Sequence, residues 1–224
     1  MGYRERDSTQ EFILQDTQAN PNLFVVAFRG TSPFDADLSW CKLEAMGNSR
    51  AHNDFMQALG LQKNKGWPKK IDQVNNGGHQ FAYYTLREKP REILQENEEA
   101  KFILTGHSLD GALAILFPSV LMLHEEKWLL DRLGGVYTFG QPRIGDEKFE
   151  EYMENMRKFD AKYFRYVYCN DMVPRVPYDD KNTLFKHFGP YLFFNSFYVG
   201  KVLPEETNKN YFSLLWVIPK VVKA

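Results

Sequence analysis

The segment TGHSLDGAL (residues 105–113) carries the residue types of an activated serine nucleophile. It nearly spells G-x-S-x-G, the pattern in which a serine occupies a sharp turn between a strand and a helix, but Asp110 stands where the last glycine belongs. Residues 101–104 predict the strand, and the apolar residues after the segment predict the helix. Such a turn lifts the Ser108 hydroxyl above the sheet, and the N–H of Leu109 can stabilise negative charge that develops on a bound carbonyl. A coincidental Gly-x-Ser is the alternative.

An aspartate stands at the end of a later predicted strand. Residues 135–140 and residues 163–168 each predict a strand, so Asp171 follows the second strand after the one that leads to Ser108. In a serine hydrolase, this is the position of the acid that holds a histidine in the tautomer needed for proton transfer. A turn aspartate ahead of Pro174 is the alternative.

The third group of such a triad is a histidine that follows the aspartate in the chain. His187 is the histidine of this sequence that meets this condition, and it is the candidate base. It lies only 16 residues after Asp171, an interval that can hardly hold a further helix and a further strand of typical lengths. His107 is expected to be structural or to line the pocket. The five histidines show no metal-ligand spacing, so the sequence predicts no metal site.

Strands and helical segments alternate along the chain, and this order predicts an α/β fold with a mostly parallel central sheet flanked by helices. The apolar run at residues 23–28 predicts a buried central strand. Residues 78–97 predict a helix that Pro90 kinks or splits. Residues 146–159 predict a further helix, capped by Asp146.

Length and composition limit the class of protein. The 224 residues and 43% hydrophobic content suit a single domain over residues 1–224, with a core over about 20–200. The net charge is −1 and no basic run occurs, which argues against a nucleic-acid partner.

The charged residues 1–7 lack the apolar stretch of a signal peptide. Cys41 and Cys169 lie far apart, which fits a reducing compartment or one disulfide. We expect an intracellular protein.

Aromatic residues gather in the last part of the chain. Seven of them lie within residues 185–198, which predicts a pair of strands that completes the sheet. A second run, at residues 211–218, is followed by Lys220 and Lys223 and predicts either a segment in a lipid interface or a core helix. Neither run reaches the ~18 residues of a transmembrane span.

Four segments, in this order, resemble the class 3 lipase family of α/β hydrolases and, within it, the plant oil-body triacylglycerol lipases. They are VAFRGT (residues 26–31), TGHSL (105–109), TFGQPRIG (138–145) and NDMVPRVP (170–177). The resemblance implies that Ser108 is the nucleophile and Asp171 the triad acid. It also implies that Thr31 completes the oxyanion hole with Leu109. The implied reaction is hydrolysis of long-chain acylglycerol esters through an acyl-enzyme, with no cofactor. We expect the α/β-hydrolase fold to be incomplete at both termini.

The sequence departs from the family pattern in three places. Asp110 replaces a glycine, where a side chain is expected to crowd the neighbouring strand, and residues 34–40 are shortened in the lid region. A carboxylate ~6 Å from the developing oxyanion opposes it by roughly 3 kcal/mol at an effective dielectric of ~20, on the order of a hundredfold in rate. The segment around His187 resembles one that precedes the family's catalytic histidine.

Two functions follow from these observations. The preferred one is a serine ester hydrolase of lipid metabolism, similar to triacylglycerol lipases, whose substrate is an acylglycerol or another lipid ester. The alternative is a catalytically impaired lipase-like protein that binds lipid. In both cases we expect peripheral association with a lipid-droplet or membrane surface. A peptidase or acyltransferase on the same fold is a third class.

Overall fold

The computed structural model describes residues 10–29, 43–46, 49–52, 55–56, 59, 82–155, 162–177 and 185–203. Within these residues, seven strands form one sheet in the order β1-β2-β5-β6-β7-β8-β9. Their bounds are β1 Gln10–Gln15, β2 Leu23–Arg29, β5 Lys101–His107, β6 Leu133–Phe139, β7 Lys162–Tyr168, β8 Tyr191–Phe194 and β9 Gly200–Leu203. A separate pair joins β3 (Leu43–Met46) to β4 (Ser49–His52).

The five strands from β2 to β8 run parallel to one another, and the edge strands β1 and β9 run antiparallel. The predicted α/β fold with a mostly parallel sheet is therefore confirmed. The sequence predicts a strand pair within residues 185–198: β8 lies in this range and pairs with β9, which follows it at Gly200–Leu203. Because parallel strands end at the same edge of a sheet, the segments after β5, β6 and β7 meet there, where ligands bind in open α/β sheets.

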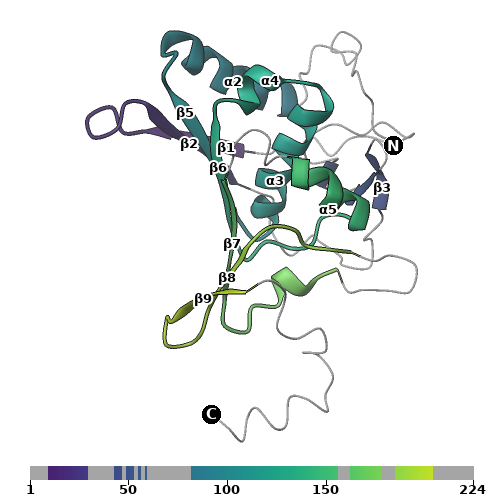
Figure 1. The fold of residues 1–224 in the computed structure, drawn as a ribbon. Coiled ribbons are helices and arrows are strands. Elements are labelled where there is room, and N and C mark those ends of the chain that lie inside the picture. The colour runs from purple at the N-terminus through teal and green to yellow at the C-terminus, as the bar shows by residue number, and fades with distance from the viewer. Residues whose placement is uncertain are drawn as a thin grey trace, which may run out of the picture.

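Four helices accompany the strands in the described part of the chain. They are α2 (Ala82–Glu96), α3 (Leu109–Leu123), α4 (Lys127–Leu130) and α5 (Glu147–Glu154). Figure 1 shows them along one side of the sheet. Side chains in β2 and β7 accordingly alternate between buried and half-buried positions. Residues 23–28 form the expected strand, β2, which lies inside the sheet between β1 and β5. Only one of its faces is buried, so the expectation of a fully buried strand is wrong.

Pro90 is expected to kink or to split the helix predicted over residues 78–97, and it does not split it. α2 continues through Pro90 to Glu96. A proline in a helix interior costs about 3 kcal/mol because it lacks an N–H and clashes with the preceding turn. Pro90 is buried together with Leu86 and Leu94, and burial of a large apolar side chain contributes about 1.5–3 kcal/mol. Packing of this face against the core therefore outweighs the local cost.

Two of the other three helices, α3 and α5, agree with the sequence. α3 is buried from Gly111 to Leu121, as the apolar residues after the Ser108 segment predict. Asp146 caps α5, because its Oδ1 accepts a hydrogen bond from the Phe149 N–H at 3.0 Å. None of the helices in the described ranges is long and apolar enough to cross a membrane.

Candidate active site

Ser108 lies at the turn between the end of β5 and the start of α3. Its backbone has φ 57° and ψ −125°, a left-handed conformation that costs a non-glycine residue roughly 1–3 kcal/mol. The Ser108 N–H donates to the carbonyl of Phe139 at the end of β6 (2.8 Å). A serine in front of a helix usually caps it, but the Ser108 hydroxyl makes no capping hydrogen bond to α3. The predicted strand–turn–helix context of this serine is confirmed.

Two glycines let the strand and the helix approach each other at this turn. A methyl group on Gly106 would collide with the backbone carbonyl of Asp110. On Gly111, it would lie 3.1 Å from Gln141 Cβ and 3.3 Å from Thr138 Cβ, on and just after β6. Asp110 is half-buried in the first turn of α3. The crowding against the neighbouring strand that the sequence predicted at Asp110 therefore falls on Gly111.

Leu109, one of the two predicted oxyanion donors, lies at the start of α3. Leu109 is the first residue of α3, so its N–H belongs to the turn whose donors lack partners within the helix. The partial positive charge of the helix N-terminus adds to this donor. Asp110 is the acidic residue of the same turn and opposes negative charge there. Thr31, the other predicted donor, lies outside the described residues.

Asp171 follows the end of β7 at the same edge of the sheet. Its Oδ1 accepts a hydrogen bond from the Val173 N–H (3.0 Å), as a turn aspartate does. Its Oδ2 faces Gly140, which has φ 58°: a methyl group there would lie 2.6 Å from Asp171 Oδ2 and 3.7 Å from His107 Nε2. One carboxylate oxygen thus holds the turn, while the other lies against Gly140.

The contact of Gly140 with Asp171 is a feature that sequence reasoning missed. The sequence shows a glycine at the end of a predicted strand, as part of the segment TFGQPRIG (residues 138–145). It does not show that this glycine lies against the carboxylate of a residue 31 positions later. One signal could have indicated this contact: a glycine stands at the end of the strand next to the one that leads to Ser108.

His187 lies in the segment before β8, beside the Asp171 loop. Its Nε2 is 2.6 Å from the carbonyl oxygen of Pro174. Because a carbonyl only accepts, Nε2 carries the proton and donates it to this bond. Pro174 belongs to a short 3-10 helix, Val173–Arg175, that follows Asp171. Within the described ranges, the structure gives no hydrogen bond from His187 to Ser108 or to Asp171.

Further hydrogen bonds tie the segments after β6 and β7 together. The Arg143 N–H donates to the Val176 carbonyl (2.8 Å), and Arg143 Nη1 donates to the Pro177 carbonyl (3.2 Å). The Lys186 N–H donates to the Gly145 carbonyl (2.8 Å). The segment that carries Gly140 is thereby fixed against those that carry Asp171 and His187. Among the residues that the structure describes, no three His, Cys, Asp or Glu side chains converge as a metal site.

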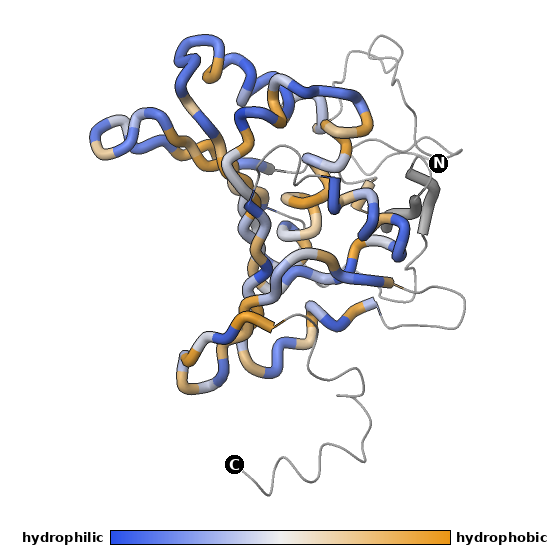
Figure 2. Tube along the Cα trace, in the orientation of Figure 1, coloured by the Kyte–Doolittle hydropathy of each residue, from blue (hydrophilic) through white to orange (hydrophobic). Residues whose placement is uncertain are grey.

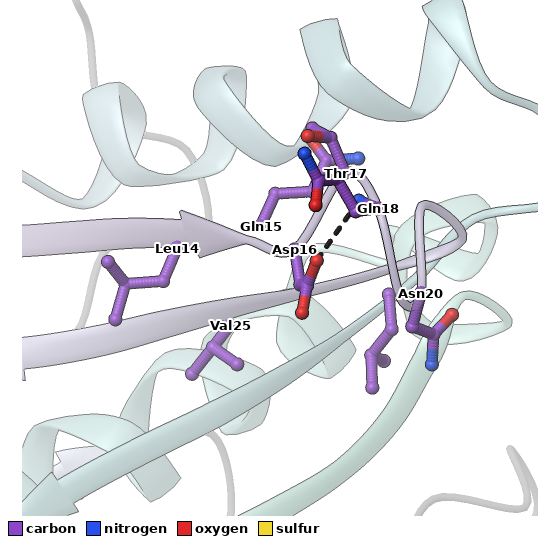
Figure 3. Close-up of a pocket in the computed structure, with 8 residues that line it drawn as sticks. Leu14, Gln15, Asp16, Thr17, Gln18, Asn20 and Val25 are labelled. Carbon is purple, nitrogen blue, oxygen red and sulfur yellow. Dashed lines mark hydrogen bonds between the residues drawn. The ribbon is translucent and has the colours of Figure 1, made fainter.

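A hollow of about 580 Å³ lies at the hairpin between β1 and β2 (Figure 3). Its lining consists of Leu14, Gln15, Asp16, Thr17, Gln18, Asn20, Leu23 and Val25. Asp16 Oδ1 accepts the N–H groups of Ala19 (2.9 Å) and Gln18 (3.0 Å), which hold the pKa of this carboxyl below its usual value. Since the hairpin precedes the start of β2, the hollow lies at the opposite edge of the sheet from Ser108 and is not part of the candidate site.

Comparison with known proteins agrees with this arrangement. The family described as Lipase (class 3) matches residues 25–181. Triacylglycerol lipase OBL1 of Arabidopsis thaliana is 41% identical over 243 residues, which cover 96% of this chain and 46% of the relative. Triacylglycerol lipase OBL1 of Nicotiana tabacum is 36% identical over 286 residues, which cover 99% of this chain and 50% of the relative. The chain thus spans about half the length of these curated relatives.

A solved structure shows the same fold. The Rhizomucor miehei lipase in a propeptide complex aligns with a TM-score of 0.65 and 24% identity, covering 88% of this chain and 55% of that one. This likeness shows the α/β-hydrolase fold, and the family match covers Ser108 and Asp171. The chain belongs to the class 3 lipase family.

Proposed function

We propose that this chain is a serine ester hydrolase that cleaves acylglycerol or related lipid esters, with Ser108 as the nucleophile. The observation that carries the proposal is the Ser108 turn: a serine with φ 57° between a strand and a helix, whose hydroxyl does not cap that helix. A serine that only ended a loop would gain from capping and would avoid this backbone conformation. The plant relatives, named triacylglycerol lipases, support a lipid ester as the substrate.

The reaction proceeds in two steps. Ser108 Oγ attacks the ester carbonyl carbon and loses its proton to a base, and the carbonyl oxygen becomes an oxyanion that the N–H of Leu109, together with Thr31, stabilises. The tetrahedral intermediate expels the alcohol, which takes up the proton, and leaves the acyl group on Ser108. Water then repeats the sequence and releases the fatty acid. Asp171 holds the base in position and stabilises its protonated form.

His187 is the third group of this proposal. It follows Asp171 in the sequence, and its hydrogen bond to Pro174 places it beside the Asp171 loop. While Nε2 donates to the Pro174 carbonyl, the nitrogen of His187 that can accept the Ser108 proton is Nδ1. Acceptance at Nε2 would require His187 to release Pro174 and turn its ring.

The lipid ester also sets where the enzyme works. Long-chain acylglycerols collect in droplets and membranes, so we propose that the chain acts as a peripheral protein at such a surface. The plant relatives support this location because their names give triacylglycerol, a lipid of this kind, as the substrate.

An active-site probe tests the proposed nucleophile. A fluorophosphonate phosphonylates an activated serine, and it should label the parent chain and lose all labelling in Ser108→Ala. Ser196→Ala, which removes an exposed serine of the β8–β9 hairpin, is the matched control and should be labelled like the parent. A separate assay measures hydrolysis of a monomeric short-chain ester by the unlabelled chain. Together the two measurements show whether Ser108 is reactive and whether the chain also completes the catalytic cycle.

The same experiment addresses the alternative function. A folded parent chain that resists the probe, with circular dichroism of an α/β protein, would contradict the hydrolase and would favour a lipase-like protein that only binds lipid. Labelling without turnover would keep Ser108 as the nucleophile and would remove His187 as the base.

A further inference from the structure

Exposed apolar side chains gather at one end of the sheet. Ten large apolar side chains are exposed in the described residues, and seven of them belong to the ends of β6 and β7, the loop after β7 and the β8–β9 hairpin. These seven are Phe139, Tyr168, Met172, Phe197, Tyr198, Val199 and Val202. Six of them lie at or near the edge where the strand before Ser108 also ends, and Val202 lies further along β9. Single exposed apolar residues need no explanation, but a cluster of this kind marks an interaction site.

The tip of the hairpin, residues 195–199, presents the most exposed of these side chains. Phe197 is 83% exposed and Tyr198 is 76% exposed. In Figure 1 this hairpin projects from the body at the far end of the sheet from β1, and Figure 2 shows hydrophobic stretches along it. The Tyr198 ring stacks on Tyr168 with the ring centroids 5.5 Å apart. Both aromatic side chains therefore stand out in solvent, and Tyr198 is supported by Tyr168 of β7.

The tip is held in a fixed conformation. Asn195 Oδ1 accepts the N–H groups of Phe197 and Val199, both at 3.0 Å, and the Tyr198 N–H donates to the Asn195 carbonyl (2.9 Å). Tyr198 has φ 58°, a left-handed position where glycine or asparagine is the usual residue of a turn. An aromatic residue at such a position costs free energy, and Tyr198 is mostly exposed, so little burial offsets this cost.

The sheet fixes this tip relative to the proposed nucleophile. The Ser108 N–H bonds to the Phe139 carbonyl of β6, and the Cys169 N–H, just after β7, bonds to the Phe194 carbonyl at the end of β8 (2.6 Å). β8 is the third strand beyond β5, so at ~4.8 Å between strands the hairpin lies about 15 Å from Ser108 along the edge. A lipid surface into which the tip inserts therefore lies close to the end of the sheet that carries Ser108.

The charge of this region favours a phospholipid surface. Within the β8–β9 hairpin, residues 191–203, Lys201 is the one charged residue. Lys201 is exposed on β9, two residues after Val199. Aromatic side chains with a cationic flank are typical of segments that bind an interface containing anionic lipid.

We propose that the hairpin tip, Phe197, Tyr198 and Val199, inserts into a phospholipid-covered lipid surface and turns the Ser108 edge toward it. This inference rests on the proposed lipid ester hydrolysis and identifies the surface through which that site meets its substrate. Residues 211–218, the interfacial segment considered from the sequence, lie outside the described residues.

Vesicle flotation of a double variant tests the insertion. The variant Phe197→Ser with Tyr198→Asn removes both rings, and asparagine keeps the left-handed turn. Phe12→Ser with Leu14→Asn is the matched control, because these β1 residues are 50% and 61% exposed at the other end of the sheet. With vesicles of phosphatidylcholine and phosphatidylserine, the hairpin variant should lose binding on the order of tenfold or more, while the control binds like the parent. Fluorophosphonate labelling of Ser108 in free solution should be the same in all three proteins.

Each other result has a defined meaning. Unchanged vesicle binding in the hairpin variant, or an equal loss in the control, overturns the proposed surface. A parent chain that dimerises in sedimentation through this hairpin, and that does not bind vesicles, overturns it in favour of a second copy as the partner. Flotation needs no catalysis, so a chain that resists the fluorophosphonate but floats through its hairpin would contradict the proposed hydrolase and not the docking surface.

Discussion

Asp171 and Gly140 lie in contact at the end of β6, so close that a methyl group on the glycine would come within 2.6 Å of Asp171 Oδ2. The same methyl group would lie 3.7 Å from His107 Nε2. The absence of a side chain on Gly140 therefore leaves the space that the carboxylate of the proposed triad acid occupies. Its φ of 58° is a second reason why a side chain fits poorly there.

Substitution Gly140→Ala should weaken the proposed site through Asp171. We expect ester hydrolysis to fall about tenfold or more, because the carboxylate must move, and stability to fall by about 1–3 kcal/mol, because alanine is strained at this φ. Gly134→Ala, in the strand β6 that leads to Gly140, is the control, since its methyl group would meet only contacts of 3.6 Å or longer. Steady-state kinetics and urea unfolding measure both effects. Full activity in Gly140→Ala would show that Asp171 needs no fixed position.

Removal of the Asp110 charge should speed hydrolysis. Asp110 is half-buried beside the Leu109 N–H, so we expect kcat to rise on the order of ten- to a hundredfold in Asp110→Asn and in Asp110→Gly. Asparagine keeps the size of the side chain and removes only the charge. An increase in the glycine variant alone would indicate a steric cause. Both variants should lose about 0.3–1 kcal/mol of stability, because an acidic residue favours the start of α3.

Two substitutions of His187 separate its structural role from its proposed role as base. The glutamine amide in His187→Gln can donate to the Pro174 carbonyl as Nε2 does, whereas His187→Ala leaves that carbonyl without this donor. We expect thermal unfolding to show a loss of about 1–3 kcal/mol in the alanine variant and a smaller loss in the glutamine variant. If His187 is the base, both variants lose ester hydrolysis. Hydrolysis that survives in His187→Gln would limit His187 to positioning the Asp171 loop.

Stability at alkaline pH should depend on Tyr163. Burial raises the pKa of the Tyr163 hydroxyl to about 12, and this hydroxyl donates to Gln141 Oε1 at 2.9 Å. The folded state therefore binds this proton more tightly than the unfolded state, whose tyrosine pKa is near 10. The stabilisation is fully present below pH ~10 and declines by up to about 2–3 kcal/mol as the pH rises toward ~12. The free energy of unfolding of Tyr163→Phe, measured over this range, should fall less steeply than that of the parent.

Local patterns in the sequence were sufficient for the fold class and for the Ser108 turn. Alternation of apolar and polar residues identifies a strand, and a glycine-rich segment between a strand and a helix identifies a sharp turn, because both depend on neighbours in the chain. The position of Asp171 after the second following strand also comes from chain order alone. Pro90 shows where such local reasoning fails, because the packing that overrides its cost involves residues of the distant core.

The sequence by itself determined the family of this protein, its mostly parallel sheet and the serine and aspartate of the candidate site. Only the tertiary structure decided that Asp171 Oδ2 lies against Gly140, that His187 Nε2 bonds to Pro174, and that Phe197 and Tyr198 stand exposed at the Ser108 edge of the sheet. These relationships join segments brought together by strand pairing. Chain spacing fixes a turn, but distances between separate strands follow only from the assembled sheet.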